Sequence, residues 1–271
     1  MVNKRLLTMS KIKDALEKAK RLRGVSAPFA LIEDEAWVKD DSAPQTAKTK
    51  KIINYSPDAI TQHNIITLAA DHYEFIERFK LFKTQILTKT QISGDRTILI
   101  TSCTNGEGKT FTAINLAIMF AREVDKRVLI VDANLRNPSV LRAFGIPVQE
   151  GLTDYLLHNK PLTDLLIGPG IEKLSLLPAG KTVQHSSEMF GSLKMQDLVA
   201  EMKGRYHDRY IFFDGPSILA SVDTLVLSKY VDKTLLVVES GKVSPQQLTE
   251  AIKLIGEDKI LGTVLNKRNP S

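Results

Sequence analysis

The stretch from Ile98 to Ala117 constrains the fold of this chain more than any other. It begins with an apolar run, Ile98 to Ile100, that is typical of a buried strand. A short polar loop containing Gly106 and Gly108 follows, and then a segment with the apolar periodicity of a helix. Strand, glycine loop and helix start in this order predict a cradle for phosphate groups, rather than an ordinary turn before a helix.

The residue types in this loop suit a polyphosphate. Backbone N–H groups at a helix N-terminus attract negative charge, and glycines such as Gly106 and Gly108 let the backbone come close. Lys109 is expected to place its ammonium group on the terminal phosphates, and Thr110 to offer its hydroxyl group to Mg²⁺. The usual motif starts with a glycine, and Cys103 stands at that position. We interpret Cys103 as a small substitute for glycine, with a redox sensor as the alternative.

The loop and the first helical turn therefore supply most of the candidate nucleotide contacts. We expect ATP and Mg²⁺ as cofactors. The candidate contacts are Cys103, Thr104, Asn105, Gly106, Glu107, Gly108, Lys109, Thr110 and Phe111.

Two aspartates follow short apolar runs further along the chain. Asp132 comes directly after the run that ends at Val131, and Asp214 after the run that ends at Phe213. Ligands of parallel sheets bind at the carboxyl ends of the strands, so both aspartates are expected to meet the Lys109 loop in one crevice. Two carboxylates beside a triphosphate suit a metal ion and an activated hydroxyl group or water. In the alternative interpretation, each aspartate only starts a loop or caps a helix.

The remaining pattern predicts an α/β fold with a mostly parallel sheet flanked by helices on both faces. Further strands are expected at 174–177, 235–238 and 260–265. Helical segments are expected at 65–87, 141–166, 189–202 and 246–255.

The chain resembles the bacterial tyrosine kinases of exopolysaccharide and capsule loci. These kinases share a nucleotide-binding fold with the partition and septum-placement ATPases. The resemblance spans roughly residues 73 to 268, and it rests on the loop at 98–117 and on an Asp-x-Asp-x-Arg-x-Pro motif. In this motif Asn134 replaces the second acid, and Asp132, Arg136 and Pro138 match. Further matches lie at 151–154, 177–180, 221–224 and 264–267.

This resemblance implies roles for individual residues. Lys109, Asp132 and Asp214 are the expected catalytic residues, with Asp132 orienting or deprotonating the attacking hydroxyl group. Thr110, Asp132 and Asp214 are the expected metal ligands. Asn266 is a candidate for the adenine edge, or it simply ends a strand.

Three functions follow as hypotheses. The first is a tyrosine-protein-kinase-like ATPase that regulates exopolysaccharide or capsule biosynthesis or export. The second is a kinase-inactive, nucleotide-gated scaffold of the same system. The third is a partition-type positioning ATPase, which is disfavoured because those enzymes carry a lysine where this chain has Thr104.

The family also forms rings through a Glu-x-x-Arg-x-x-Arg helix. Here the pattern is Glu77, Lys80 and Lys83, so we expect a homo-oligomer interface, with a solvated charged face as the alternative. Lysine is a poorer bidentate partner than arginine, which weakens this expectation. Phenylalanines on another side of the same helix are expected to face the core, namely Phe75, Phe79 and Phe82.

Tyrosines are scattered along the sequence. Kinases of this family carry a cluster of tyrosines in a flexible tail, which neighbouring subunits phosphorylate. This chain has no cluster, and its tyrosines are Tyr55, Tyr73, Tyr155, Tyr206, Tyr210 and Tyr230. Either it phosphorylates another protein, or it keeps nucleotide binding without autophosphorylation.

The net charge of +6 is concentrated at the N-terminus. Residues 1–23 carry eight Lys or Arg side chains against two acids. We expect them to form a basic amphipathic helix. This helix is expected to touch a membrane surface or a partner, or to be a solubilising arm. A linker, partly disordered, is expected at 24–58, and the ATPase domain at 59–271. The neutral remainder does not favour a specific nucleic acid partner.

The compartment is also an expectation from composition. One cysteine excludes a disulfide within the chain, and no apolar run approaches the roughly 20 residues that cross a bilayer. We expect a cytoplasmic protein, or one held at the inner face of the membrane by a membrane-bound polysaccharide co-polymerase or adaptor.

Overall fold

The computed structural model describes residues 51–65, 73–205 and 208–267. The basic helix expected at 1–23 and most of the expected linker lie outside these ranges. Within the described residues, no helix combines the length and apolar character that a bilayer crossing requires.

The described residues build one sheet in the order β1-β4-β5-β3-β6-β2-β7-β8. All neighbouring strands are parallel except the pair β4 and β5, so the mostly parallel sheet expected from the sequence is confirmed. The strands are β1 (Lys51–Ile52), β2 (Thr97–Ser102), β3 (Arg127–Asp132), β4 (Ile167–Gly168), β5 (Leu174–Leu177), β6 (Arg209–Asp214), β7 (Lys233–Glu239) and β8 (Ile260–Asn266).

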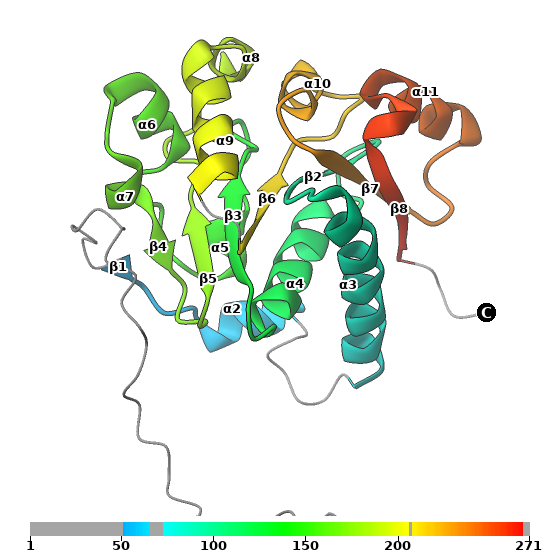
Figure 1. Ribbon diagram of the computed structural model, residues 1–271, viewed down its shortest axis with the longest axis horizontal. Helices are drawn as coiled ribbons and strands as arrows, with labels where there is room; N and C mark the ends of the chain where they lie inside the picture. Colours follow the sequence, from blue (N-terminus) through cyan, green and yellow to red (C-terminus); the bar gives the residue numbers. More distant parts are fainter. Residues whose placement is uncertain (1–50, 66–72, 206–207, 268–271) are drawn as a thin grey trace, which may run out of the picture. The chain divides into compact units, whose positions relative to one another are not determined.

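Helices alternate with these strands along the chain (Figure 1). They are α2 (Pro57–Gln62), α3 (Tyr73–Ser93), α4 (Lys109–Ala121), α5 (Val140–Ala143), α6 (Leu152–His158), α7 (Leu162–Leu165), α8 (Ser186–Phe190), α9 (Leu193–Arg205), α10 (Val222–Ser228) and α11 (Pro245–Ile255), with the 3-10 turn η2 (Glu257–Lys259).

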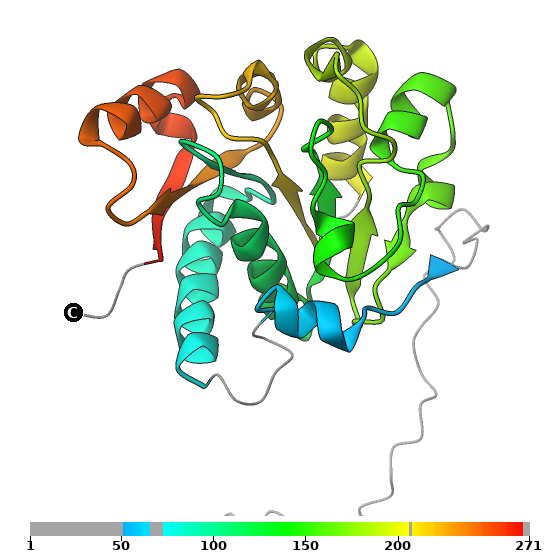
Figure 2. The ribbon, with the colours of Figure 1, turned by 180° about the vertical axis from the view of Figure 1, so that it is seen from behind.

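Both faces of the central strands are covered by helices. Ile98 and Ile100 of β2 pack into a core with Ile114 of α4, whereas Leu99 between them belongs to a second core with Leu198 of α9. Successive side chains of a strand point to opposite faces, so a strand buried on both sides is apolar throughout. Figure 2 turns the side with α2 and α5 toward the viewer.

The strand order decides where the functional residues meet. β6 lies between β3 and β2, so the ends of these three strands are neighbours at one edge of the sheet. Asp132 and Asp214 are register partners on β3 and β6. The glycine loop follows the end of β2 at Ser102.

The start of the folded domain differs from the expectation. Residues 51–52 form an edge strand, and Ile53 N donates a hydrogen bond to the Gly168 carbonyl oxygen at 2.8 Å. Helix α2 already begins at Pro57, so the boundary expected between residues 58 and 59 falls inside this helix. Strands as short as β1 and β4 carry no periodic pattern, and only tertiary hydrogen bonding defines them.

Two expected helical features also need correction. The segment 189–202 is two helices, because α8 ends at Phe190 and α9 begins at Leu193. Phe75 is 46% exposed, because it lies in the first turn of α3, away from the core. Phe79 and Phe82 pack against the core as expected.

Candidate functional site

The loop between β2 and α4 has the backbone that a phosphate cradle requires. Gly106 and Gly108 have φ values of 83° and 94°, which glycine adopts without strain. A Cβ atom on Gly108 would lie 2.1 Å from Asn266 Nδ2. Gly108 is also the N-cap residue of α4, so the loop opens onto a positive helix end.

Several donors of this loop have no acceptor among the described residues. Within the described part of the chain, the N–H groups of Gly106, Glu107 and Gly108 have no protein acceptor. The Lys109 ammonium group makes no hydrogen bond or ion pair with a described residue, although its charge acts on Asp214. A cavity of about 290 Å³ lies beside Lys109 and Thr110. Free amides and a free ammonium group beside a cavity suit an anion.

Thr110 connects the loop to the neighbouring strands. Its Oγ1 donates a hydrogen bond to Asp214 Oδ2 at 2.6 Å and lies 2.8 Å from Ser139 Oγ. Thr110 and Asp214 were expected at this site, whereas Ser139 was not. The position of Ser139 directly before a helix start was the available signal, because serine is favoured there.

Asp132 is held by backbone donors that begin α5. Its Oδ2 accepts hydrogen bonds from Ser139 N at 3.0 Å and Val140 N at 2.9 Å, and its Oδ1 accepts one from Asn134 N at 3.3 Å. Asp132, the first residue of the Asp-x-Asp-x-Arg-x-Pro motif, therefore orders the loop that runs to the start of α5.

Burial raises the pKa of both carboxyl groups. The pKa of Asp132 rises to about 6, although its backbone hydrogen bonds and the charge of Arg142 oppose the rise. The pKa of Asp214 rises to about 7, through burial and through the negative charge of Asp132. Two buried like charges favour protonation of one of them or binding of a cation.

A buried carboxylate oxygen without a partner in the part of the chain that the structure describes favours binding of a cation over protonation of the pair. Asp214 Oδ1 has no hydrogen-bond partner among the described residues. Asp214 Oδ1 and the Thr110 hydroxyl group are oxygen atoms of the kind that Mg²⁺ binds. Within the described ranges, no cluster of three or more His, Cys, Asp or Glu residues exists, so a dedicated protein cage for a metal is not present there.

Two residues lie at the boundary between the cavity beside Lys109 and a second, larger groove. Asn137 and Arg142 line both the phosphate-sized cavity and a groove of about 990 Å³ that borders Asp132. Asn134, the amide that replaces an acid, lines the smaller cavity. Asn137 and Arg142 were not predicted as site residues, because nothing in their spacing indicates that the loop before α5 and α5 itself place them beside these cavities.

Arg136 joins two motifs that lie far apart in the sequence. Its Nε donates a hydrogen bond to Ser186 Oγ at 2.8 Å and lies 3.6 Å from Asp223 Oδ2. Ser186 Oγ also donates to this buried carboxylate. The segment 221–224 therefore holds Arg136 of the Asp-x-Asp-x-Arg-x-Pro motif in place through Asp223.

Cys103 and Glu107 turn their side chains into the protein. Cys103 is fully buried against Leu236 and Val238, and burial together with the charge of Glu107 raises the pKa of its thiol to about 11. Such a thiol remains protonated, which argues against the redox alternative.

The Glu107 carboxylate accepts hydrogen bonds from both N and Oγ1 of Thr104. Asn105 is exposed, and its Oδ1 accepts a hydrogen bond from Ser217 Oγ at 2.6 Å. These side chains tie the loop together, and only their backbone groups are left for a phosphate.

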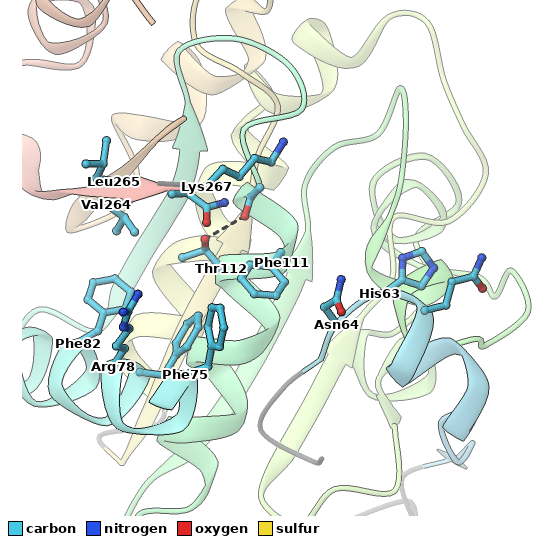
Figure 3. Close-up of a pocket in the computed structure, with 14 residues that line it drawn as sticks. His63, Asn64, Phe75, Arg78, Phe82, Phe111, Thr112, Val264, Leu265 and Lys267 are labelled. Carbon is cyan, nitrogen blue, oxygen red and sulfur yellow. Dashed lines mark hydrogen bonds between the residues drawn. The ribbon is translucent and has the colours of Figure 1, made fainter. Parts of the chain in front are cut away.

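An apolar pocket of about 760 Å³ adjoins the cradle, and Gly108 and Phe111 line both spaces. Figure 3 shows this pocket with Phe82 on α3, Phe111 on α4 and Lys267 at the end of β8. Asn266 also lines it, and its Nδ2 donates a hydrogen bond to the Glu107 carbonyl oxygen at 2.8 Å. Its position beside the pocket is compatible with the expected adenine contact.

The expected interface residues divide into two groups. Glu77 and Lys80 form an ion pair of 2.7 Å that is about half exposed. Lys83 is 15% exposed and pairs with Glu123 just beyond the end of α4, within the same subunit. Of the three expected interface residues, Glu77 and Lys80 therefore remain accessible.

Fold and site together define a P-loop nucleotide-binding protein. The AAA domain family matches residues 95–264, which contain the loop and both aspartates. The chain belongs to this family.

Comparison with known proteins narrows the class. The chain is 31% identical over 212 residues to the tyrosine-protein kinase YwqD of Bacillus subtilis, covering 78% of this chain and 88% of that protein. It is 30% identical over 208 residues to the tyrosine-protein kinase CpsD of Streptococcus pneumoniae serotype 4, covering 74% and 90%. The crystal structure of the chimerical protein CapA2B2 superposes with a TM-score of 0.68 at 26% identity, covering 81% and 94%. The chain is a member of the bacterial tyrosine-protein kinase family.

Proposed function

We propose that this protein is an ATP-dependent protein-tyrosine kinase of an exopolysaccharide or capsule system. The observation that carries the proposal is the convergence of Thr110, Asp214 and Asp132 behind a loop whose amides face a cavity. This is the arrangement that phosphoryl transfer needs, because positioning and charge neutralisation supply most of its catalysis.

The phosphates of ATP lie along the loop. Lys109 and the free N–H groups of Gly106 to Gly108 neutralise the β- and γ-phosphates. Adenine occupies the adjoining apolar pocket beside Phe111, and Asn266 Oδ1 accepts a hydrogen bond from the exocyclic amino group.

Thr110 and Asp214 hold Mg²⁺, with Asp132 as a further ligand or as a partner of a coordinated water. The ion supplies charge neutralisation at the phosphates when it is bound. Asn134 offers only a neutral oxygen at the cavity, so it orients a water or a phosphate and does not act as a base.

Asp132 is the group that receives the proton of the acceptor. The tyrosine oxygen attacks the γ-phosphorus atom, the bond from this atom to the β–γ bridging oxygen breaks, and ADP leaves with the electron pair. The tyrosine proton passes to the Asp132 carboxylate. Burial raises the pKa of this group toward neutrality, which improves its match to proton transfer.

The groove beside Asp132 is the approach route for the acceptor. It is lined by Pro138, Arg142 and Gly180 among others, and it adjoins the phosphate cavity at Asn137 and Arg142. In-line transfer would require an acceptor in this groove to approach the γ-phosphate from the side opposite the leaving ADP.

A nucleotide-gated scaffold without kinase activity is the second candidate. Asn134 in place of the second acid favours it, because the cavity holds less negative charge for a metal ion. The partition-type alternative has no specific observation in its favour.

We further propose that the protein works at the inner face of the cell membrane through a membrane-bound polysaccharide co-polymerase, and that it forms homo-oligomers through the accessible part of the α3 surface at Glu77 and Lys80. No specific nucleic acid is involved. Size-exclusion chromatography with light scattering of the wild type and of Glu77→Ala tests the oligomer.

Intact-mass spectrometry tests the kinase proposal. Purified full-length protein is incubated with Mg-ATP, alone and with a mixed tyrosine-containing peptide library. Phosphotyrosine that is lost in Lys109→Ala and Asp132→Asn supports the kinase. Saturable Mg-ATP binding without transfer to any tyrosine supports the scaffold, and the absence of nucleotide binding overturns both proposals.

A further inference from the structure

Three consecutive carbonyl groups of the phosphate loop are bonded by side chains from a distant part of the chain. The Asn105 oxygen accepts a hydrogen bond from Lys242 Nζ at 2.7 Å, and the Gly106 oxygen accepts one from Lys267 Nζ at 2.7 Å. The Glu107 oxygen accepts its hydrogen bond from Asn266 Nδ2. All three donors follow β7 or end β8, more than a hundred residues after the loop.

The planar peptide bond converts these contacts into an orientation of the loop amides. In a trans peptide the C=O of one residue and the N–H of the next residue point in opposite directions. The described chain contains no cis peptide bond. A donor that holds the carbonyls of Asn105, Gly106 and Glu107 on the outside therefore turns the N–H groups of the following residues, Gly106 to Gly108, to the inside. These are the amides without a protein acceptor.

Glu239 holds the two ammonium groups in place. Its Oε2 lies 3.4 Å from Lys242 Nζ and 3.2 Å from Lys267 Nζ. Its backbone N–H donates a hydrogen bond to the Glu107 carboxylate at 3.0 Å, which ties the end of β7 to the same loop. A lysine ammonium group has three donors, so each can serve the carbonyl and the carboxylate together.

We propose that Lys242 and Lys267 are positioning residues that preorganise the phosphate loop from its outer side, with Glu239 as their common anchor. Both act on the loop carbonyls through hydrogen bonds, and Lys267 also lines the pocket proposed for adenine. Their effect on binding comes from the conformation of the loop before ATP arrives, since amides that are already turned inward need no ordering on binding.

Direct electrostatic attraction of the nucleotide by the two lysines is the competing explanation. The two explanations predict opposite changes in Mg-ATP affinity when the Glu239 carboxylate is removed. If the lysines attract the triphosphate through their charge, removal of the neighbouring Glu239 carboxylate strengthens Mg-ATP binding. If the lysines hold the carbonyls, removal of their anchor releases them, and Glu239→Ala weakens Mg-ATP binding. The Mg-ATP affinity of Glu239→Ala therefore distinguishes the positioning role from electrostatic attraction.

The experiment uses full-length wild-type protein and the variants Lys242→Ala, Lys267→Ala, the double variant, Lys267→Arg and Glu239→Ala. Lys233→Ala is the matched control, because Lys233 Nζ also donates to a backbone carbonyl, that of Asp258, at 2.7 Å, away from the loop. Amide hydrogen exchange of the peptide covering 103–110 is measured without nucleotide, and Mg-ATP affinity by calorimetry.

We expect faster exchange in this peptide and about 5- to 30-fold weaker Mg-ATP binding in the double variant, a loss at the lower end of the range for two hydrogen bonds. Glu239→Ala shifts both quantities in the same direction, Lys267→Arg restores them, and Lys233→Ala leaves them unchanged. Tighter binding in Glu239→Ala, or unchanged loop exchange in the double variant, overturns the inference.

The inference rests on the proposed nucleotide binding only for the measurement of Mg-ATP affinity. If the wild type binds no nucleotide, the proposed function fails, whereas the exchange experiment on the free protein still decides whether the lysines order the loop.

Discussion

Asp132 and Asp214 lie directly opposite each other on the neighbouring parallel strands β3 and β6, and both side chains are buried. Each carboxylate raises the cost of ionising the other, so the pair stores electrostatic repulsion at the end of the sheet. A cation bound at these acids would relieve this repulsion, as the proposed Mg²⁺ site requires.

This pair predicts how stability depends on pH. Both pKa values are raised in the folded protein, to about 6 and about 7, above the ordinary value for aspartate. The protonated pair contributes fully to the free energy of unfolding below the ordinary pKa of aspartate. This contribution is lost as the pH rises through the folded pKa values. We expect the melting temperature without nucleotide and metal to fall between about pH 4 and about pH 7, and to level off above this range. Asp214→Asn should flatten this fall, and an equally steep fall in that variant would contradict the assignment.

The same pair predicts that Mg²⁺ and protons compete. Metal binding requires the ionised carboxylates, so affinity for Mg²⁺ in the presence of ADP should increase from about pH 5.5 to about pH 8, with proton release on binding. Calorimetry in two buffers of different ionisation enthalpy measures the protons released. Binding that is independent of pH would place the metal away from Asp214.

Lys109 is expected to contribute directly to nucleotide affinity. Loss of its ammonium group should weaken Mg-ATP binding by about 1.5 to 3 kcal/mol, the range for hydrogen bonds to charged groups. Fold stability should change little, because Lys109 makes no ion pair with a described residue and acts on Asp214 only through its charge. Lys89→Ala is the control, since Lys89 Nζ donates to the Leu261 carbonyl at 2.9 Å, outside the site. Equal affinities in Lys109→Ala and wild type would refute the site.

Two glycines give a matched test of the loop backbone. Gly108 has a φ of 94° and no room for a Cβ atom beside Asn266, so Gly108→Ala should lower stability by about 1 to 3 kcal/mol and abolish Mg-ATP binding. Gly204 lies in α9 with open space around its Cα, so Gly204→Ala should raise stability by about 0.5 to 1 kcal/mol. Urea denaturation measures both, and a neutral Gly108→Ala would mean that the loop adopts another conformation.

Cys103 provides a chemical probe of the same loop. Its thiol is buried and its pKa is raised to about 11, so a thiol reagent near neutral pH should not modify it in the native protein. Full modification is expected in denaturant. Mass spectrometry after treatment with iodoacetamide gives the result, and rapid native labelling would restore the redox hypothesis.

The sequence alone determined the central strands and the identity of the cradle. Residues 98–100 and 128–131 are apolar without interruption because helices cover both faces of the sheet, and this pattern is evident in the order of the amino acids. Gly106, Gly108, Lys109 and Thr110 likewise indicate their role, because a phosphate loop needs those residue types in that order.

Only the tertiary structure decided which other residues serve this loop. β1 and β4 are too short to carry a pattern, and Lys242 and Lys267 look like ordinary surface lysines in the sequence. The order of the strands brings β7 and β8 beside the loop after β2, and it sets Asp132 against Asp214 across β3 and β6. Local sequence encodes the hydrophobic period and the backbone freedom of single residues, whereas contacts between residues far apart in the chain depend on how the sheet is assembled.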